Sequence, residues 1–206
     1  MRKQIAQAFK KVRRYDIPGH AHFLTFSCYR RLPLLTNDKW RTWLADSVKE
    51  ACCTLNIALW AYVFMPEHVH LLIWPRQEDY SISAFLKAAK QPAAVRALNQ
   101  LKRESSSLLQ ELAVEKSGRA THRFWQAGGG YDLNIWSMKK ATEKAHYCHR
   151  NPVIRGLVTE PTNWRWSSFR WIEMGMTSDA PLELDSWDES LTPLKKVDWF
   201  QNPFPH

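Results

Sequence analysis

The chain has 206 residues and a formal net charge of +9, and this length suits one domain with elaborations and a sizeable core. It contains no apolar run long enough to span a membrane and no apolar segment typical of a signal peptide, so we expect a soluble, cytoplasmic protein. Its four cysteines lack the C-x-x-C spacing of zinc ribbons and redox motifs, which argues against a disulfide framework and a structural zinc site.

The charge is unevenly distributed along the chain. Residues 173–206 hold seven acidic side chains and two lysines, so residues 1–172 carry a net charge of +14. Together with eleven tryptophans, such a basic body favours a polyanionic partner whose phosphates pair with Lys and Arg and whose unpaired bases stack on aromatic rings. Most of these tryptophans are equally compatible with a place in the core. We predict a folded domain over residues 1–172 and a flexible acidic tail over 173–206.

In chain order, the first segment is basic. Residues 1–14 contain six Lys or Arg side chains and no acid, which is typical either of a solvated tail or of an arm that becomes ordered on DNA. Residues 22–29 predict a first strand. A helix is then expected over about residues 38–55, because apolar side chains recur at helical spacing after the capping residues Asn37 and Asp38.

A β-hairpin follows. Residues 56–65 and 68–74 are rich in strand-forming side chains and flank a tight turn at Pro66-Glu67, where Glu67 could support a histidine or merely occupy the turn. His68 and His70 are separated by one residue, so both side chains lie on one face of the second strand. Two imidazoles on a stiff strand could bind a metal ion, although an H-x-H pair alone is more often structural.

The second half of the predicted domain is mostly helical. The pattern over residues 81–116 predicts a helix broken or kinked at Pro92. Residues 121–125 and 131–136 predict one or two strands around a run of three glycines, and a last helix is expected to stop at Pro152. Strand, helix, hairpin, helix and strand in this order indicate an α+β sandwich with an antiparallel sheet.

Two side chains of the last predicted helix could take part in a chemical reaction. Tyr147 and Asn151 are four residues apart and therefore share one helix face. Beside two imidazoles, a phenol would supply a nucleophile and an amide oxygen a third ligand for a divalent cation. The alternative for Tyr147 is a tyrosine packed on the sheet, and the rival nucleophiles are Tyr131 and Tyr15.

Eight short motifs occur in a fixed order between residues 13 and 172. They are Tyr15-x-x-Pro-Gly19, Phe23-x-Thr-Phe26, Arg30-Arg-Leu-Pro-Leu-Leu35, Pro66-Glu-His-Val-His70, Phe124-Trp-Gln126, Tyr147-x-x-x-Asn-Pro-Val153, Gly156-Leu-Val158 and Trp164-Arg-Trp-Ser-Ser-Phe169. In this combination the chain resembles the REP-associated tyrosine transposases, relatives of the insertion-sequence single-tyrosine transposases in the HUH endonuclease superfamily. The resemblance implies a ferredoxin-like βαββαβ core followed by a helix that carries a catalytic tyrosine.

The resemblance also implies a reaction. Tyr147 would attack a DNA phosphate to form a 5′-phosphotyrosine, while His68, His70 and Asn151 would bind Mg²⁺ or Mn²⁺; zinc would also suit these ligands. The expected partner is single-stranded or hairpin DNA, handled by a monomer, whereas insertion-sequence relatives act as dimers with exchanged tyrosines. Two alternatives stay open: a domesticated DNA-hairpin-binding protein without efficient cleavage, and a replication-type nickase.

Basic side chains in the predicted arm, after the first strand and on the long helix are candidate phosphate contacts. These residues are Arg13, Arg14, Arg30, Arg31, Lys87, Lys90 and Arg96. A protein that binds DNA through such a surface is expected to be associated with the nucleoid.

Overall fold

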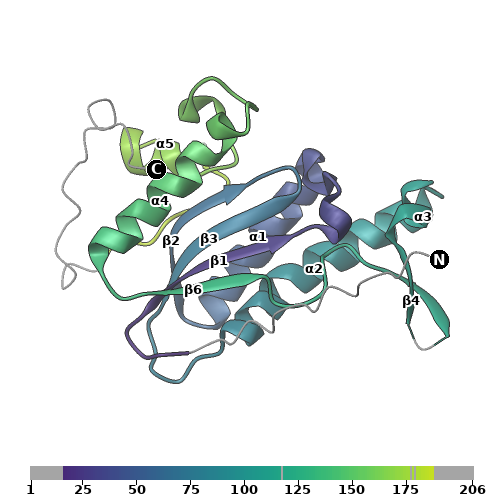
Figure 1. The fold of residues 1–206 in the computed structure, drawn as a ribbon, viewed down its shortest axis with the longest axis horizontal. Coiled ribbons are helices and arrows are strands. Elements are labelled where there is room, and N and C mark those ends of the chain that lie inside the picture. The colour runs from purple at the N-terminus through teal and green to yellow at the C-terminus, as the bar shows by residue number, and fades with distance from the viewer. Residues whose placement is uncertain (1–15, 117, 177, 179, 188–206) are drawn as a thin grey trace, which may run out of the picture.

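One antiparallel sheet organises the fold (Figure 1). The structure, a computed structural model, describes residues 16–116, 118–176, 178 and 180–187. The sheet has the strand order β2-β3-β1-β6, and all neighbouring strands are antiparallel. Its strands are β1 (Ala21–Ser27), β2 (Ile57–Phe64), β3 (His68–Pro75) and β6 (Tyr131–Ile135). The predicted α+β class with an antiparallel sheet is confirmed.

Helices cover both faces of this sheet. On one face α1 (Asp38–Thr54) and α2 (Ile82–Arg103) pack against each other, and α4 (Met138–Ile154) lies on the opposite face (Figure 1). These elements follow the chain order expected from the sequence. Shorter elements are the helices α3 (Leu108–Leu112) and α5 (Phe169–Met174) and the 3-10 turns Tyr29–Arg31, Leu34–Thr36 and Pro161–Asn163.

The alternation of side chains along the strands separates two cores. Leu24 and Leu71 belong to the core beneath α1 and α2, whereas Phe23 and Leu72 belong to the core beneath α4. Because successive side chains of a strand point to opposite faces, His70 shares the α4 face with Leu72. The predicted histidine pair is thus directed toward the helix that carries Tyr147.

Each long helix begins after a polar side chain that accepts a backbone N–H. Asn37 caps α1, Ser81 caps α2 and Ser137 caps α4, each through the N–H three residues further on. Such caps satisfy one of the free N–H groups at a helix start. The helix starts agree with the sequence patterns because capping is a local interaction.

Two prolines lie inside helices, so the predicted break at Pro92 is absent and the predicted stop at Pro152 falls two residues before the helix ends. α2 continues through Pro92, which is exposed, so water can satisfy the carbonyl that loses its partner. α4 continues past Pro152 to Ile154, and Gly156 then adopts a left-handed φ of 66°. Glycine in this conformation is a common helix terminator, and it sets the end of α4 here.

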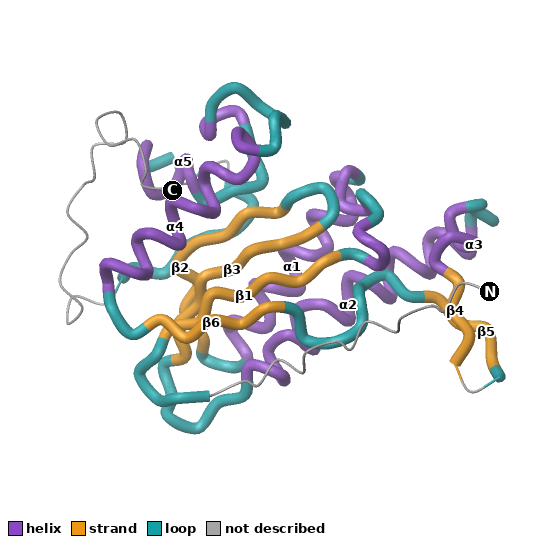
Figure 2. The backbone as a smooth tube through the Cα atoms, in the orientation of Figure 1, coloured by secondary structure: helices purple, strands orange, loops and turns teal. Residues whose placement is uncertain are grey.

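The segment between α2 and β6 also differs from the predicted helix. The chain leaves α2 after Arg103, forms α3 and then makes a hairpin of β4 (Ala113–Lys116) and β5 (Arg119–His122). Figure 2 shows this hairpin beside α3, away from the four-stranded sheet. The four residues of each strand are too few for their periodicity to distinguish a strand from the end of a helix.

The flexible tail predicted from residue 173 does not hold for its described part. Leu182 is buried in the core, and the ring of Trp187 stacks on that of Trp60 with the centroids 4.7 Å apart. Asp185 accepts the Leu59 N–H with its carboxylate at 2.9 Å and donates its own N–H to the Leu59 carbonyl. β2 is an edge strand, so these residues satisfy backbone groups that its neighbour β3 does not reach. Residues 188–206 lie outside the described residues.

The Trp-rich motif near residue 166 covers the other end of β2. The Phe64 N–H donates to the Trp166 carbonyl at 2.8 Å, and the Ser168 N–H donates to the Tyr62 carbonyl at 3.0 Å. The Ser168 hydroxyl lies 2.9 Å from His149 Nε2 of α4. This segment therefore links the edge of the sheet to α4. In the described part of the chain no helix is both long and apolar enough to cross a membrane.

Candidate active site

Two imidazoles at the start of β3 lie close together. His68 Nε2 and His70 Nε2 are 3.0 Å apart, and each residue is only 4% exposed. This separation allows both nitrogens to bind one ion at the roughly 2.1 Å of an imidazole–metal bond. The rigid hairpin holds the pair in place without help from flexible loops.

The other ring nitrogen of each histidine has a partner. His68 Nδ1 lies 3.1 Å from Glu67 Oε1, and a carboxylate can only accept, so His68 donates here and its Nε2 carries the lone pair. His70 Nδ1 lies 2.7 Å from Thr25 Oγ1, which can accept in the same way. Two lone pairs would then face each other across 3.0 Å, an arrangement that a cation between them stabilises.

Burial keeps both imidazoles neutral. It lowers the pKa of His70 to about 3, with smaller contributions from the neighbouring His68 imidazole and from the positive charges of Lys144 and Arg31. Burial also lowers the pKa of His68, although the neighbouring Glu67 opposes this shift. Neutral imidazoles are the form that binds metal ions, so the pair is suited to that role at neutral pH.

Asn151 completes the cluster from α4. Its Nδ2 lies 3.3 Å from His70 Nε2, and its Oδ1 is buried with no hydrogen-bond partner among the described residues. A half-turn of the amide exchanges these two atoms, which would direct the oxygen toward the histidines. The described residues contain no group of three His, Cys, Asp or Glu side chains placed to hold a metal. Two imidazoles and an amide oxygen nevertheless fit a divalent cation that keeps further positions for water or phosphate.

Tyr147 faces the same cluster. Its ring centroid lies 5.2 Å from that of His70 and 5.9 Å from that of Phe23, both in edge-on contacts. Although it touches the sheet, Tyr147 is 44% exposed, so it is not a purely packed core tyrosine. An approaching phosphate could reach the phenol and the histidines together.

The rival tyrosine Tyr131 is placed less favourably. Thr25 of β1 pairs with His70 on one side and with Tyr131 on the other, so the three side chains share the α4 face. Tyr131 is therefore two strands, or about 10 Å, from His70. The second rival, Tyr15, lies outside the described residues.

Comparison with known proteins identifies the family. Residues 18–150 match the family model described as IS200-like transposase. The chain belongs to the IS200-like transposases. This confirms the family expected from the ordered motifs and assigns the protein to enzymes that act on DNA. A comparison with curated proteins found no match.

Two solved structures were compared with this transposase. A REP-associated tyrosine transposase bound to a REP hairpin has a TM-score of 0.63 and 21% identity, over 92% of this chain and 100% of that chain. A candidate transposase from Deinococcus radiodurans R1 has a TM-score of 0.42 and 19% identity, over 71% of this chain and 95% of that chain. The first likeness shows that the two proteins have the same fold.

The predicted DNA contacts of the transposase are divided between two faces. Arg30 and Arg31 are exposed just after β1, and Arg31 is near enough to the histidines to influence the pKa of both. The basic residues of α2 lie across the sheet from the histidines, because α2 covers the opposite face. Arg13 and Arg14 lie outside the described residues. The DNA contacts of all seven basic residues stay a prediction.

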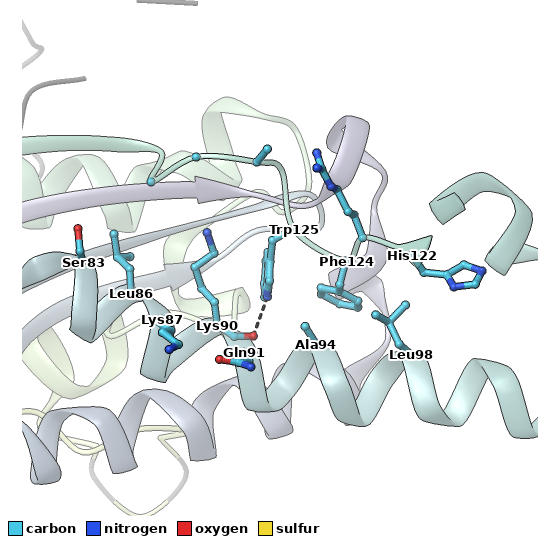
Figure 3. A pocket seen from close by; sticks show the side chains of 14 residues that line it. Ser83, Leu86, Lys87, Lys90, Gln91, Ala94, Leu98, His122, Phe124 and Trp125 are labelled. Carbon is cyan, nitrogen blue, oxygen red and sulfur yellow. Dashed lines mark hydrogen bonds between the residues drawn. The ribbon is translucent and has the colours of Figure 1, made fainter. Parts of the chain in front are cut away.

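On the α2 face, two of these residues line a groove of about 510 Å³ (Figure 3). Lys87 and Lys90 stand on α2, and Trp125 closes the groove by donating its Nε1–H to the Lys90 carbonyl at 2.8 Å. Arg96 is placed differently, because its guanidinium lies over the ring of Trp43 at 4.9 Å. It also lies 3.6 Å from a carboxylate oxygen of Asp46, so it links α2 to α1.

Sequence reasoning missed three residues around the site. Lys144 lies three residues before Tyr147 on α4, and its Nζ is 5.6 Å from the centre of the Tyr147 ring. Helical spacing could have identified it. Arg155, 2.9 Å from Glu67, has no comparable signal, since only the fold brings it to the histidines. Thr25 belongs to the Phe23-x-Thr-Phe26 motif, but that motif does not indicate its contact with His70. The suggestion that Glu67 supports a histidine agrees with its contact to His68.

Proposed function

We propose that this transposase cleaves and rejoins single-stranded DNA at hairpin-forming repeats through a covalent bond between Tyr147 and the DNA. The convergence of the Tyr147 ring, the histidine pair and the Asn151 amide on one half-open site carries this proposal. The bound REP hairpin of the similar structure supports a hairpin as the substrate class.

In the proposed reaction the phenol oxygen of Tyr147 attacks the scissile phosphorus, and the bond from phosphorus to the 3′-oxygen breaks. The products are a 5′-phosphotyrosine and a free 3′-hydroxyl, which receives the proton lost by the phenol. The number of phosphoester bonds is unchanged, so the reverse attack by a 3′-hydroxyl rejoins DNA without an external energy source. Transfer to a different 3′-end would be strand transfer.

His68, His70 and Asn151 would hold Mg²⁺ or Mn²⁺, which when bound polarises the scissile phosphate and offsets its developing charge. The neutral state of both imidazoles supports this role, as does the Asn151 oxygen, which has no hydrogen-bond partner among the described residues. The positive side chains of Lys144 and Arg31 would attract the phosphodiester toward the phenol.

The basic groove on the α2 face would bind parts of the DNA that lie farther from the scissile phosphate. Lys87 and Lys90 suit phosphates at its rim, while the exposed Arg30 and Arg31 would contact the strand nearer the histidines. The ion pair and ring contact of Arg96 leave it less available for phosphate.

We further propose that the protein acts as a monomer, because its own residues 182–187 occupy the β2 edge that could otherwise pair with a second sheet.

Covalent trapping tests the proposal. The protein is incubated with labelled single-stranded hairpin DNA and Mn²⁺, and a denaturation-resistant adduct is sought. We expect the adduct with wild type and with Tyr131→Phe, and its loss with Tyr147→Phe and with His68→Ala. Tyr131→Phe is the matched control because it removes a phenol from the same face of the sheet.

Three outcomes would contradict the proposal. An adduct that survives Tyr147→Phe would assign the nucleophile to another residue. Tight hairpin binding without an adduct, under conditions that support Mn²⁺ binding, would favour a DNA-binding protein without cleavage. An adduct formed equally well on single strands that lack a hairpin would argue against hairpin-forming repeats as the substrate.

A further inference from the structure

The glycine run before β6 contains one position that admits no side chain. Gly130 has a φ of 73°, and a Cβ built there would lie 1.9 Å from the carbonyl oxygen and 3.0 Å from the carbonyl carbon of Thr25. These are backbone atoms of a central strand, so a flexible side chain cannot relieve the clash. Gly128 provides a contrast: its φ is 90°, but a Cβ there would have no neighbour within 4 Å.

Thr25 connects this close approach to the histidine cluster. Its backbone lies between β3 and β6, paired with His70 on one side and Tyr131 on the other. Its hydroxyl lies 2.7 Å from His70 Nδ1. From the same face of β1, the Phe23 ring stacks on the His70 imidazole with the centroids 5.3 Å apart and an angle of 14° between the planes. Two side chains of β1 thus hold the His70 ring.

We propose that Thr25 is a positioning residue for His70, and that the absence of a side chain at Gly130 keeps Thr25 in place. This inference rests on the proposed role of His70 as a ligand of a divalent cation. When Nε2 binds a cation, the ring proton must be on Nδ1, and the Thr25 hydroxyl is the acceptor placed to receive it. Phe23 restrains the plane of the ring, and Thr25 restrains its rotation within that plane.

Removal of the acceptor should weaken cation binding. Without Thr25 Oγ1, a proton on Nδ1 would be buried without a partner, so the neutral ring would favour the tautomer with its proton on Nε2. That tautomer directs a proton at the cation instead of a lone pair. Loss of a partner of this kind typically reduces metal affinity by about 10- to 100-fold.

The first test is Mn²⁺ titration of the full chain without DNA, followed by electron paramagnetic resonance of the free ion. We expect Thr25→Val, which keeps the shape of the side chain, to weaken binding by about 10- to 100-fold. Thr25→Ser keeps the hydroxyl and should bind within about threefold of wild type. Equal affinities of wild type and Thr25→Val would overturn the positioning role.

The second test compares two glycines. Gly130→Ala and Gly128→Ala share the cost of a side chain at positive φ, but only the first meets the Thr25 backbone. We expect Gly130→Ala to lose Mn²⁺ affinity as Thr25→Val does and Gly128→Ala to keep it. Equal losses in both alanine variants would show that the close approach at Gly130 has no specific role.

Nitrogen-15 NMR of the imidazoles separates this inference from the proposed metal site. Without added metal, the His70 ring signals should change in Thr25→Val and Gly130→Ala but not in Thr25→Ser or Gly128→Ala. A wild-type protein that binds no Mn²⁺ would overturn the metal site. Unchanged His70 signals in Thr25→Val would overturn the positioning role, whatever the metal result.

Discussion

The ring of Tyr147 stands edge-on to the ring of His70, with the planes at 77° and the centroids 5.2 Å apart. This contact involves the carbon frame of the tyrosine and leaves the residue 44% exposed. Reactivity and packing at this position can therefore be separated by mutation. Tyr147→Phe should abolish the DNA adduct yet change the free energy of unfolding by no more than about 0.5 kcal/mol. Parallel urea denaturation and trapping check this, and a strongly destabilised variant would contradict it.

The amide oxygen of Asn151 is expected to contribute to Mn²⁺ binding. Asn151→Asp keeps an oxygen ligand and adds charge, so we expect Mn²⁺ to bind at least as tightly as to wild type. Asn151→Leu keeps the approximate volume but removes the ligand, and affinity should fall by about tenfold or more, in line with other perturbations of metal sites. Isothermal titration with Mn²⁺ measures both. Unchanged binding in Asn151→Leu would remove Asn151 from the ligand set.

The positive charge of Lys144 near the Tyr147 phenol is expected to strengthen DNA binding. Lys144→Ala is expected to weaken binding of single-stranded DNA and to make the plot of log affinity against log salt concentration shallower by about 0.7, the value for one phosphate contact. Lys139→Ala removes the same charge from an exposed position of the same helix and is the matched control. Fluorescence anisotropy at several salt concentrations gives both slopes. Equal slopes in the two variants would mean that Lys144 contributes only net charge.

Buried neutral histidines should make the fold sensitive to acid. Burial lowers the pKa of His149 from 6.5 to about 3, and His70 is shifted to a similar value. Below pH 6.5 the unfolded chain binds protons that the folded chain excludes, so stability is greatest above this pH and falls toward pH 3. The slope should be up to about 1.4 kcal/mol per pH unit for each histidine.

Urea midpoints at pH 7.5, 6.0 and 5.0, without added metal, measure this dependence. His149→Gln should show a shallower fall with pH than wild type, because one of the histidines with a lowered pKa is gone. An unchanged slope in His149→Gln would indicate that His149 does not titrate differently in the two states.

The described part of the acidic segment should stabilise the fold. Leu182 is 3% exposed, and Leu182→Ala should lower the free energy of unfolding by about 2 to 4 kcal/mol, as for other buried leucines. Glu183→Ala is the matched control, because its side chain is 73% exposed and its ion pair with Lys49 is at the surface. Chemical denaturation measures the free energy of unfolding of both variants. Equal stabilities would mean that burial of the Leu182 side chain does not stabilise the fold.

The amino-acid sequence alone determined the local features of this transposase. Alternation placed His68 and His70 on one face, helical spacing placed Tyr147 beside Asn151, and the capping residues Asn37 and Asp38 marked the start of the first long helix. Each of these depends on residues within one or two turns of the chain. For that reason the α+β class and the candidate residues could be predicted before any contact was known.

Only the tertiary structure decided how distant segments meet. It brought Thr25 of β1 and Arg155, just beyond α4, to the histidine pair, and it placed residues 182–187 against the edge of the sheet. It also allowed α2 to continue through Pro92, because the exposed face of a well-packed helix tolerates one missing hydrogen bond. Such outcomes depend on which surfaces bury each other and which backbone groups find partners, and no short stretch of sequence contains that information.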